Sequence, residues 1–274
     1  MSGSGVSTER HGTIALLTLD HAPVNSLSHP MREALWDALV RADADAGVDR
    51  IVLTGAGRGF CAGGDLNELH LPIQQAMPGI SNHLLPRIEA CSKPVVAAVH
   101  GFAIGGGLEL ALACHYRVAH RNARIALPEI KHGVVPPSGS QRMPRAIGVA
   151  RSLTMIIGAE SVPAEQFADT SLFDLICDGD VVVAALAFAA RLDTAAPPAA
   201  VLLRHRTRPL EDPGPHAAIA AWRQQLGLLH ESREVAGHCI AAVEHGITAR
   251  DFDAGLMAAK QLHDLLASAR MASP

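Results

Sequence analysis

The chain has 274 residues, of which 49% are hydrophobic, and that is enough to build one substantial globular domain with a small addition. Its net charge is −4 with both signs scattered along the sequence, so no basic block indicates a nucleic-acid surface. Aromatic residues make up only 3%, which argues against binding through base stacking.

The chain opens on a small, polar stretch, MSGSGVSTER, which we expect to form a disordered tail. No apolar core of the signal-peptide type follows a basic start. The longest apolar run, residues 181–190, is too short to span a bilayer. We therefore expect a soluble, cytoplasmic protein with no membrane partner.

Strand-like and helix-like segments alternate over the first half of the chain. Residues 13–19 are apolar and prone to β-structure, and Ser28 can cap a helix over about 30–44. The further expected elements are a helix at about 79–91 and strands at 50–55, 93–101, 116–120 and 124–129. Strands, glycine turns and helices in this alternation indicate an α/β fold.

The chain changes character after about residue 140. The next helices are expected around 149–158, 163–168 and 181–193. A proline-rich connection over 196–215 leads to a helical part, about 216–270. We expect two domains, a core over 1–200 that holds the site and a helical region over 201–274. The apolar stripe of the last helix indicates either packing on its own domain or an oligomer contact.

Two glycine-rich turns each follow a strand-like run. The first turn is Gly63-Gly64-Asp65, near the end of the segment IVLTGAGRGFCAGGDL (51–66). The second turn is Gly105-Gly106-Gly107, within VVAAVHGFAIGGGLELALAC (95–114). Backbone N–H groups from two such turns can hold one oxyanion between them. The second turn also opens a helix, whose free N–H groups and dipole favour negative charge. Glu109 lies three residues after Gly106 on the same helix face, so we expect an acid/base carboxylate beside an oxyanion hole.

Glu129 is the second carboxylate of interest, because it directly follows a buried-looking strand and Pro128. A carboxylate in that place either forms a structural ion pair or acts as a tuned acid/base group. Glu109 has a comparable alternative, since a glutamate in a first helical turn also complements the helix dipole. The residues alone leave these alternatives open.

Other motifs in the chain carry weaker signals. GAGRGF (55–60) follows a strand, but its third glycine is misplaced for dinucleotide binding and the segment continues as loop. Cys61 has no readable His/Asn arrangement beside it, and five cysteines without a CxxC pair are typical of reduced packing thiols. The fifteen histidines are dispersed, with no paired ligand spacing, so we expect no metal site.

Three long segments together carry a resemblance. They are GFCAGGDL, HGFAIGGGLELALACHYRVA and LPEIKHGVVPPSGSQRMPRAIG, in that order. They resemble the crotonase family, that is, the enoyl-CoA hydratase/isomerase superfamily. Their sequences most resemble the hydratase/isomerase half of bifunctional β-oxidation enzymes. The dehydrogenase half of such enzymes is absent from this sequence. Weaker similarity covers most of residues 10–270, including the FDAGL-like C-terminal stretch.

The resemblance implies a crotonase-like spiral of ββα units with a helical C-terminal region that builds trimers, which often pair into hexamers. It implies an acyl-CoA thioester as substrate and no cofactor beyond the coenzyme A of that substrate. By position, the oxyanion N–H groups fall on Gly64 and Gly106, and the two catalytic glutamates are Glu109 and Glu129. The substrate-binding residues implied in the same way are Ala62, Asp65, Leu66 and Asn67.

Two glutamates together favour a 2-enoyl-CoA hydratase, in which Glu109 takes a proton from water and Glu129 delivers one to C2. The chain departs from its close relatives at PPSGSQR, one residue shorter than their PGAGGTQR. Pro137, in the shortened loop 136–139, stands at or beside a glycine whose N–H helps to hold the water, and proline has no N–H. The alternatives are a Δ3,Δ2-enoyl-CoA isomerase or another lyase of the family, and a non-catalytic acyl-CoA-binding protein.

Overall fold

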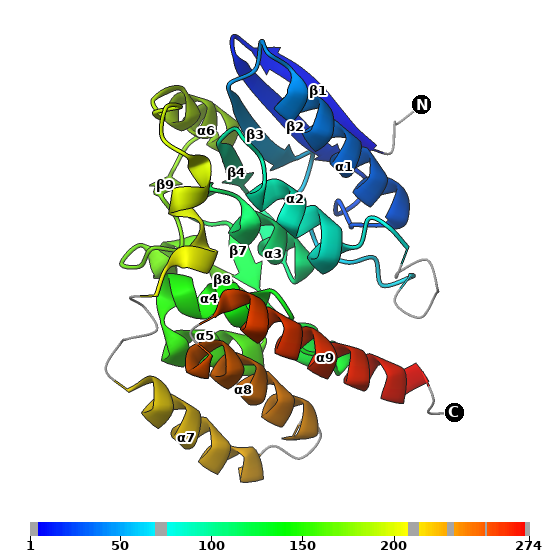
Figure 1. The fold of residues 1–274 in the computed structure, drawn as a ribbon, viewed down its shortest axis with the longest axis vertical. Coiled ribbons are helices and arrows are strands. Elements are labelled where there is room, and N and C mark those ends of the chain that lie inside the picture. Colours follow the sequence, from blue (N-terminus) through cyan, green and yellow to red (C-terminus); the bar gives the residue numbers. More distant parts are fainter. Residues whose placement is uncertain (1–4, 69–75, 208–213, 229–232, 250, 272–274) are drawn as a thin grey trace. The chain divides into compact units, whose positions relative to one another are not determined.

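The computed structural model of the chain describes residues 5–68, 76–207, 214–228, 233–249 and 251–271 (Figure 1). The chain divides into two compact units. Unit 1 comprises Met1–Ile125 and Val162–Leu202, and unit 2 comprises Ala126–Ser161 and Leu203–Pro274. The expected division into 1–200 and 201–274 stays a prediction, and residues 126–161 group with the C-terminal helices in unit 2.

Unit 1 is built on a six-stranded sheet in the order β1-β2-β3-β4-β6-β9. These strands are β1 (Gly5–His11), β2 (Ile14–Asp20), β3 (Arg50–Gly55), β4 (Val95–Val99), β6 (Tyr116–His120) and β9 (Leu175–Cys177). β1 and β2 pair antiparallel, and the other neighbouring pairs are parallel. Parallel strands buried on both faces need apolar residues throughout. The sequence VVAAV of β4 is accordingly buried along its whole length.

The disordered tail expected over MSGSGVSTER is wrong from residue 5 onward, because residues 5–11 form β1. β1 lies at the edge of the sheet, and its backbone pairs with β2 from Gly5 opposite Asp20 to His11 opposite Ile14. Most of its side chains are exposed, so they carry no apolar alternation that would reveal a strand. Hydrogen bonds to β2, rather than local sequence, determine its structure.

Helices cover both faces of the sheet in unit 1 (Figure 1). α6 (Val181–Ala190) buries residues 181, 185 and 189 against Leu16, Val52 and Val96. Because successive strand residues point to opposite faces, the remaining buried strand residues face the other way, where α1 (His29–Ala44) contacts β1 and β2. The other described elements of unit 1 are η2 (Ile80–Leu84), α2 (Leu85–Glu89), β5 (Phe102–Ile104), α3 (Gly106–Ala113), β7 (Arg124–Ala126), β8 (Val162–Pro163), η4 (Ala164–Phe167) and η5 (Pro198–Val201).

Unit 2 is helical. Its main elements are η3 (Glu129–His132), α4 (Gly139–Ile147), α5 (Val149–Gly158), α7 (Pro215–Gln225), α8 (Arg233–Thr248) and α9 (Phe252–Met271). α8 and α9 pack on each other and on α4, whose buried Gln141 donates to the Ala242 carbonyl at 2.8 Å. Among the described helices, none combines the length and the apolarity that a membrane span requires.

Candidate active site

The segments that lead to the two glycine turns begin where neighbouring parallel strands end. β3 ends at Gly55 and β4 at Val99, and the two strands pair directly, with Ile51 opposite Val95. The carboxyl ends of adjacent parallel strands meet at one edge of the sheet, where ligands bind in open α/β folds. The topology therefore starts both turns side by side, although they lie far apart in the sequence.

The segment that leads into the first glycine turn pairs with β5, the strand that precedes the second turn. The Cys61 N–H donates to the Phe102 carbonyl (3.2 Å), and the Ile104 N–H donates to the Cys61 carbonyl (3.0 Å). Gly63 has φ +91°, and a Cβ there would lie 2.6 Å from the Ile104 oxygen and 2.9 Å from the Gly106 nitrogen. Only glycine fits this backbone conformation and this close approach. The two turns therefore pack backbone against backbone.

The amides of Gly64 and Gly106 are close neighbours, since a Cβ built on Gly106 would lie 3.5 Å from the Gly64 nitrogen. Gly106 opens α3, and the first N–H groups of a helix have no acceptor within it. Within the part of the chain that the structure describes, neither amide has a hydrogen-bond acceptor. Two adjacent donors of this kind form the geometry of an oxyanion hole.

Glu109 lies in the first turn of α3 and is only 3% exposed. Its backbone N–H donates to the Gly105 carbonyl (3.0 Å), which makes it the first hydrogen-bonded amide of the helix. Glu109 therefore lies in the helix turn whose free N–H groups form the positive end of the helix dipole. The structure thus brings Glu109, Gly64 and Gly106 together in unit 1.

Glu129 belongs to unit 2, where it is the first residue of η3 after Pro128. Its carbonyl accepts from the Val134 N–H (3.2 Å), which closes the turn after η3. Burial raises the pKa of the Cys239 thiol on α8 to about 12, and the nearby charge of Glu129 acts in the same direction. The two glutamates singled out in the sequence therefore lie in different units.

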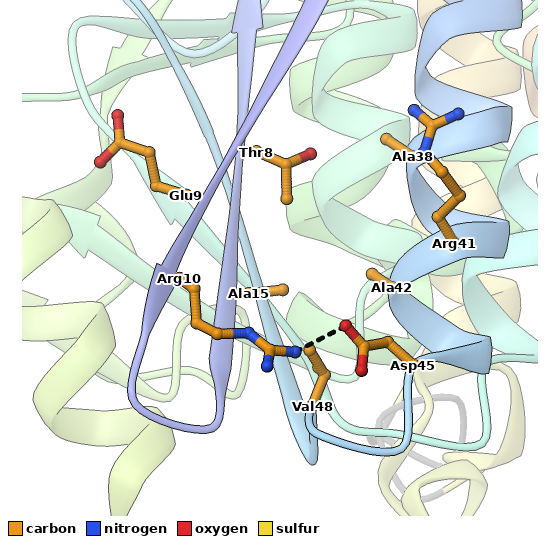
Figure 2. A pocket seen from close by; sticks show the side chains of 9 residues that line it. All are labelled: Thr8, Glu9, Arg10, Ala15, Ala38, Arg41, Ala42, Asp45 and Val48. Carbon is orange, nitrogen blue, oxygen red and sulfur yellow. Dashed lines mark hydrogen bonds and ion pairs between the residues drawn. The ribbon is translucent and has the colours of Figure 1, made fainter.

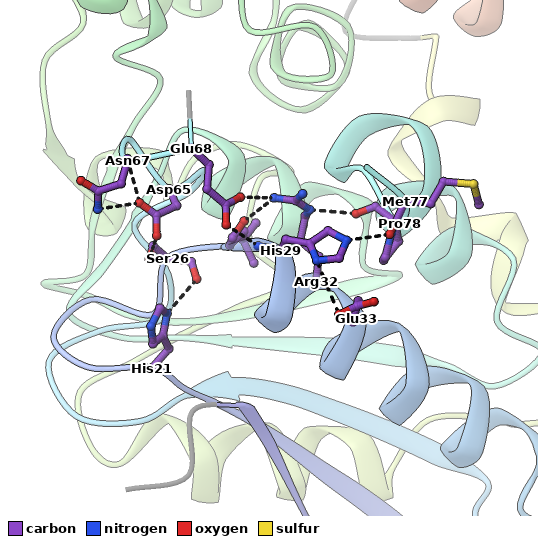
Figure 3. A network of polar contacts seen from close by, with 11 residues as sticks. His21, Ser26, His29, Arg32, Glu33, Asp65, Asn67, Glu68, Met77 and Pro78 are labelled. Atoms are coloured by element: carbon purple, nitrogen blue, oxygen red, sulfur yellow. Dashed lines mark hydrogen bonds and ion pairs between the residues drawn. The ribbon is translucent and has the colours of Figure 1, made fainter. Parts of the chain in front are cut away.

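The segment after Gly64 forms a tight turn around Asp65 (Figure 3). The Oδ1 atom of Asp65 accepts from the backbone and side-chain amides of Asn67, at 2.9 and 3.0 Å, and Oδ2 accepts from the Ser26 hydroxyl at 3.4 Å. Leu66 is exposed on the turn, and Ala62 is half-buried. The carboxylate of Asp65 thus stabilises the turn, and the substrate-binding roles of these four residues stay predictions.

Sequence analysis missed Ile80 and Arg32. The Ile80 Cδ1 atom lies 3.5 Å from the Cβ position of Gly106 and 3.8 Å from that of Gly64, so it forms an apolar wall beside both amides. No local signal reveals it, because the contact joins distant segments. Arg32 could have been noticed in the sequence, because it is a charged residue on the helix face that also buries Leu35.

Cysteine chemistry finds no support at this site. Cys61 is fully buried, and burial raises the pKa of its thiol to about 12, so it is not a nucleophile at neutral pH. Among the described residues, no group of three His, Cys, Asp or Glu side chains is arranged to hold a metal ion.

A separate cavity of about 220 Å³ lies between β1 and α1 (Figure 2). Its lining includes Arg10, Arg41 and Asp45, and Arg10 donates to the Asp45 carboxylate at 2.6 Å. The Gly47 N–H also donates to Asp45, at 2.8 Å. This exposed ion pair adds little to stability. The lining includes no residue of the glycine turns, so the cavity is distinct from the oxyanion hole.

Comparison with known proteins decides the family. The model of the family described as enoyl-CoA hydratase/isomerase matches residues 9–236. The chain belongs to the enoyl-CoA hydratase/isomerase family. It therefore has the crotonase fold, as the three sequence segments predicted.

Relatives within the enoyl-CoA hydratase/isomerase family differ in length. The chain is 41% identical over 178 residues to the peroxisomal bifunctional enzyme of Danio rerio, covering 65% of this chain but only 24% of that protein. It is 37% identical over 191 residues to a probable enoyl-CoA hydratase of Bacillus subtilis (strain 168), covering 67% and 74%. The solved enoyl-CoA hydratase from Polaromonas sp. JS666 matches with a TM-score of 0.66 and 29% identity, over 90% of this chain and 98% of that chain.

Proposed function

We propose that this chain is an enoyl-CoA hydratase, which adds water to a 2-enoyl-CoA to give a 3-hydroxyacyl-CoA. The observation that carries the proposal is the pair of neighbouring amides on Gly64 and Gly106, with the buried Glu109 three residues after Gly106 in α3. The name of the Bacillus subtilis relative supports the same reaction.

The two amides bind the carbonyl oxygen of the thioester in this proposal. Their hydrogen bonds polarise the conjugated system, which makes C3 electrophilic, and they stabilise the enolate oxygen that forms when water adds. One donor of this kind contributes roughly 3 kcal/mol to the stability of the transition state. The dipole of α3 acts in the same direction, because Gly106 is its first residue.

The two glutamates perform the proton transfers. Glu109 takes a proton from water as the water oxygen bonds to C3, and the electron pair of the double bond moves onto the thioester oxygen. Glu129, in its acid form, delivers a proton to C2 as the enolate collapses. Each positioned acid or base of this sort accelerates a reaction by about 10²–10⁴-fold. The reaction needs no cofactor, because coenzyme A is part of the substrate.

A Δ3,Δ2-enoyl-CoA isomerase is the second candidate, and Pro137 is the observation that favours it. Pro137 is buried and has no N–H to hold a water, while its carbonyl accepts from the Ser140 hydroxyl at 3.0 Å. Isomerisation needs no water and only one glutamate as a proton shuttle. A non-catalytic acyl-CoA-binding protein is disfavoured, because it has no chemical need for Glu109 and Glu129.

A hydration assay with crotonyl-CoA tests the proposal. The loss of absorbance of the conjugated thioester measures the reaction. We expect Glu109→Gln and Glu129→Gln each to lower turnover by at least about 10²-fold while the fold is retained. Glu89→Gln is the matched control, because Glu89 is also a buried glutamate of unit 1 but lies on α2. Near-wild-type hydration by either variant removes that residue from the mechanism, and isomerisation that survives Glu109→Gln favours the second candidate.

The proposal extends to assembly and location. We propose a homotrimer or a pair of trimers, as the C-terminal resemblance implies. We also propose that the chain acts in the cytoplasm. The Bacillus subtilis relative is consistent with this location, whereas the Danio rerio relative is named as peroxisomal.

A further inference from the structure

Arg32 is a buried arginine to which the proposed chemistry assigns no role. It lies near the start of α1, and its side chain is only 2% exposed. A buried guanidinium is costly unless its donors are satisfied. Arg32 donates to the Leu27 carbonyl (3.0 Å), the Pro78 carbonyl (2.8 Å) and the Glu68 carboxylate (2.9 Å) (Figure 3). These acceptors belong to three separate segments, and each segment leads to the oxyanion hole.

Leu27 makes the first connection. Its carbonyl is held by Arg32, and its N–H donates to the Gly63 carbonyl at 2.7 Å. Leu27 also forms a parallel bridge with Gly64. A single residue, Leu27, therefore links the Arg32 guanidinium to the backbone that carries the Gly64 amide.

Glu68 makes the second connection. Its carboxylate accepts from Arg32 through Oε2 and from the His29 N–H at the start of α1 through Oε1, at 2.8 Å. The Glu68 N–H donates to the Asp65 carbonyl at 3.0 Å. This carboxylate therefore caps α1 in place of Ser28, whose side chain makes no capping hydrogen bond, and it anchors the turn that follows Gly64.

Pro78 makes the third connection. Its carbonyl accepts from the Arg32 Nε–H, and the preceding Met77 carbonyl forms a hydrogen bond with the His29 ring at 3.0 Å. Two residues further on, Ile80 lies against both oxyanion glycines. The same guanidinium thus holds the wall of the site as well as its first amide.

We propose that Arg32, with Glu68 as its counter-ion, is the positioning residue of the oxyanion hole. It holds the Gly64 amide and the Ile80 side chain in place, and it does not contact substrate. Its effect on turnover rests on the proposed function, whereas its effect on the backbone does not. A displacement of about 1 Å at a reacting centre can cost about 10²-fold in rate.

Arg117 provides a matched control for Arg32. It is fully buried and also donates to two carbonyls and one carboxylate, those of Leu172 (2.7 Å), Cys114 (2.6 Å) and Asp174 (3.3 Å). None of these groups belongs to the segments that Arg32 holds. Loss of either guanidinium removes a comparable set of hydrogen bonds. A difference in activity between the two variants therefore reflects which segments the arginine holds, rather than a general loss of stability.

The first measurement is the steady-state kinetics of crotonyl-CoA hydration. We expect Arg32→Gln to lower kcat about 10–100-fold with a smaller change in KM, because an oxyanion hole acts on the transition state. Arg32→Lys should recover part of this loss, and Arg117→Gln should stay within about threefold of wild type. An equal loss in Arg32→Gln and Arg117→Gln, or a kcat for Arg32→Gln within about twofold of wild type, overturns the proposal.

The second measurement needs no substrate. Hydrogen exchange followed by mass spectrometry should be faster over residues 60–68 and 76–84 in Arg32→Gln, and unchanged there in Arg117→Gln. Unchanged exchange in Arg32→Gln overturns the proposal. Faster exchange in a protein whose wild type hydrates no enoyl-CoA upholds the positioning role and rejects the proposed function. If Arg32→Gln does not fold, Glu68→Gln and Arg32→Lys undergo the same two comparisons.

Discussion

The oxyanion donors are backbone amides, so a substitution removes one only when it removes the N–H. Packing restricts most of the glycines here, since a Cβ on Gly107 would lie 2.3 Å from the Cys61 carbonyl oxygen. Gly64 differs, because among the described residues the nearest atom to its Cβ position is the Ile80 Cδ1, at the ordinary contact distance of 3.8 Å. Gly64 is therefore the position where the amide can be tested with the least disturbance of packing.

We predict that Gly64→Pro lowers turnover by about 10²–10³-fold, because proline has no N–H to offer to the thioester oxygen. Gly64→Ala keeps the N–H and should remain within several-fold of wild type. Steady-state hydration assays on both variants check this, with circular dichroism to establish that they fold. A folded Gly64→Pro protein with normal activity would contradict the oxyanion assignment.

His115 is fully buried, and its Nδ1 accepts from the Val95 N–H at 3.1 Å. Burial, together with the neighbouring charge of Arg117, lowers the pKa of His115 to about 4, against the opposing effects of the backbone of Glu89 and the charge of Asp43. The unfolded chain binds the proton near pH 6.5, before the folded state does. Stability is therefore complete above pH 6.5 and falls as the pH decreases toward 4.

We predict that the free energy of unfolding decreases by about 3 kcal/mol as the pH falls from 6.5 to 4, because of the titration of His115. Urea unfolding across this range measures the slope. His115→Asn keeps an acceptor for the Val95 N–H and does not titrate, so its stability should depend less on pH. An equal slope in this variant and in wild type would show that another group is responsible.

The candidate site was predicted in part from the sequence. The sequence places Gly64, Gly106 and Glu109 correctly in relation to strand ends and a helix start, because the topology of parallel strands determines where such turns lie. Arg32 and Ile80 could not be placed, because their contacts depend on how distant segments fold together. The catalytic roles of the glutamates stay predictions.

At the scale of elements, buried strands and amphipathic helices were the most predictable features. The strand at 50–55 and the helix at 149–158 have the expected bounds. One expectation differs from the structure, because residues 164–167 form only a 3₁₀ turn. The helical part expected at 216–270 is confirmed over the described residues, where it consists of α7, the short 3₁₀ turn η8 (Leu226–Leu228), α8 and α9. Composition indicates helix over such a region, but it does not reveal where the chain turns back to pack.

The crossing of α8 and α9 depends on glycine. A Cβ on Gly255 would lie 2.3 Å from the Gln141 Oε1 and 2.7 Å from the Gly246 Cα. The backbone atom cannot move aside, so we predict that Gly255→Ala destabilises the chain by about 1–3 kcal/mol despite the better helix propensity of alanine.

Gly237→Ala on α8 is the control, because among the described residues its Cβ would meet only the Leu226 side chain, at 3.9 Å. We expect this variant to gain about 0.5–1 kcal/mol from helix propensity. Denaturant unfolding of the two variants measures the difference. Equal stability of the two would mean that the α8–α9 crossing has room for a methyl group.

At the scale of the whole molecule, family membership establishes the fold, and each unit contributes different chemistry to the proposal. Unit 1 holds the glycine turns and Glu109, at the carboxyl edge of a parallel sheet. Unit 2 holds Glu129 together with the C-terminal helices. In the chain order, Glu129 thus lies in a helical excursion, residues 126–161, that groups with the C-terminal region.

The last helix also bears on assembly. Met257 and Leu265 on α9 are each 59% exposed in the single chain, and they lie within a helix whose other side packs on α8 and α4. Large apolar side chains on one outer face favour contact with another surface, since their burial is stabilising. This is the expected feature of a helix that contributes to an oligomer.

We predict that light scattering at micromolar concentration gives three or six times the mass of one chain. Met257→Asp combined with Leu265→Asp should shift the protein toward smaller species, because a buried carboxylate without a partner is costly. Val183→Asp on α6, another exposed apolar position, is the control and should leave the mass unchanged. A wild-type mass of one chain rejects the trimer. A trimer that survives the double substitution shows instead that the subunits meet through surfaces other than this face of α9.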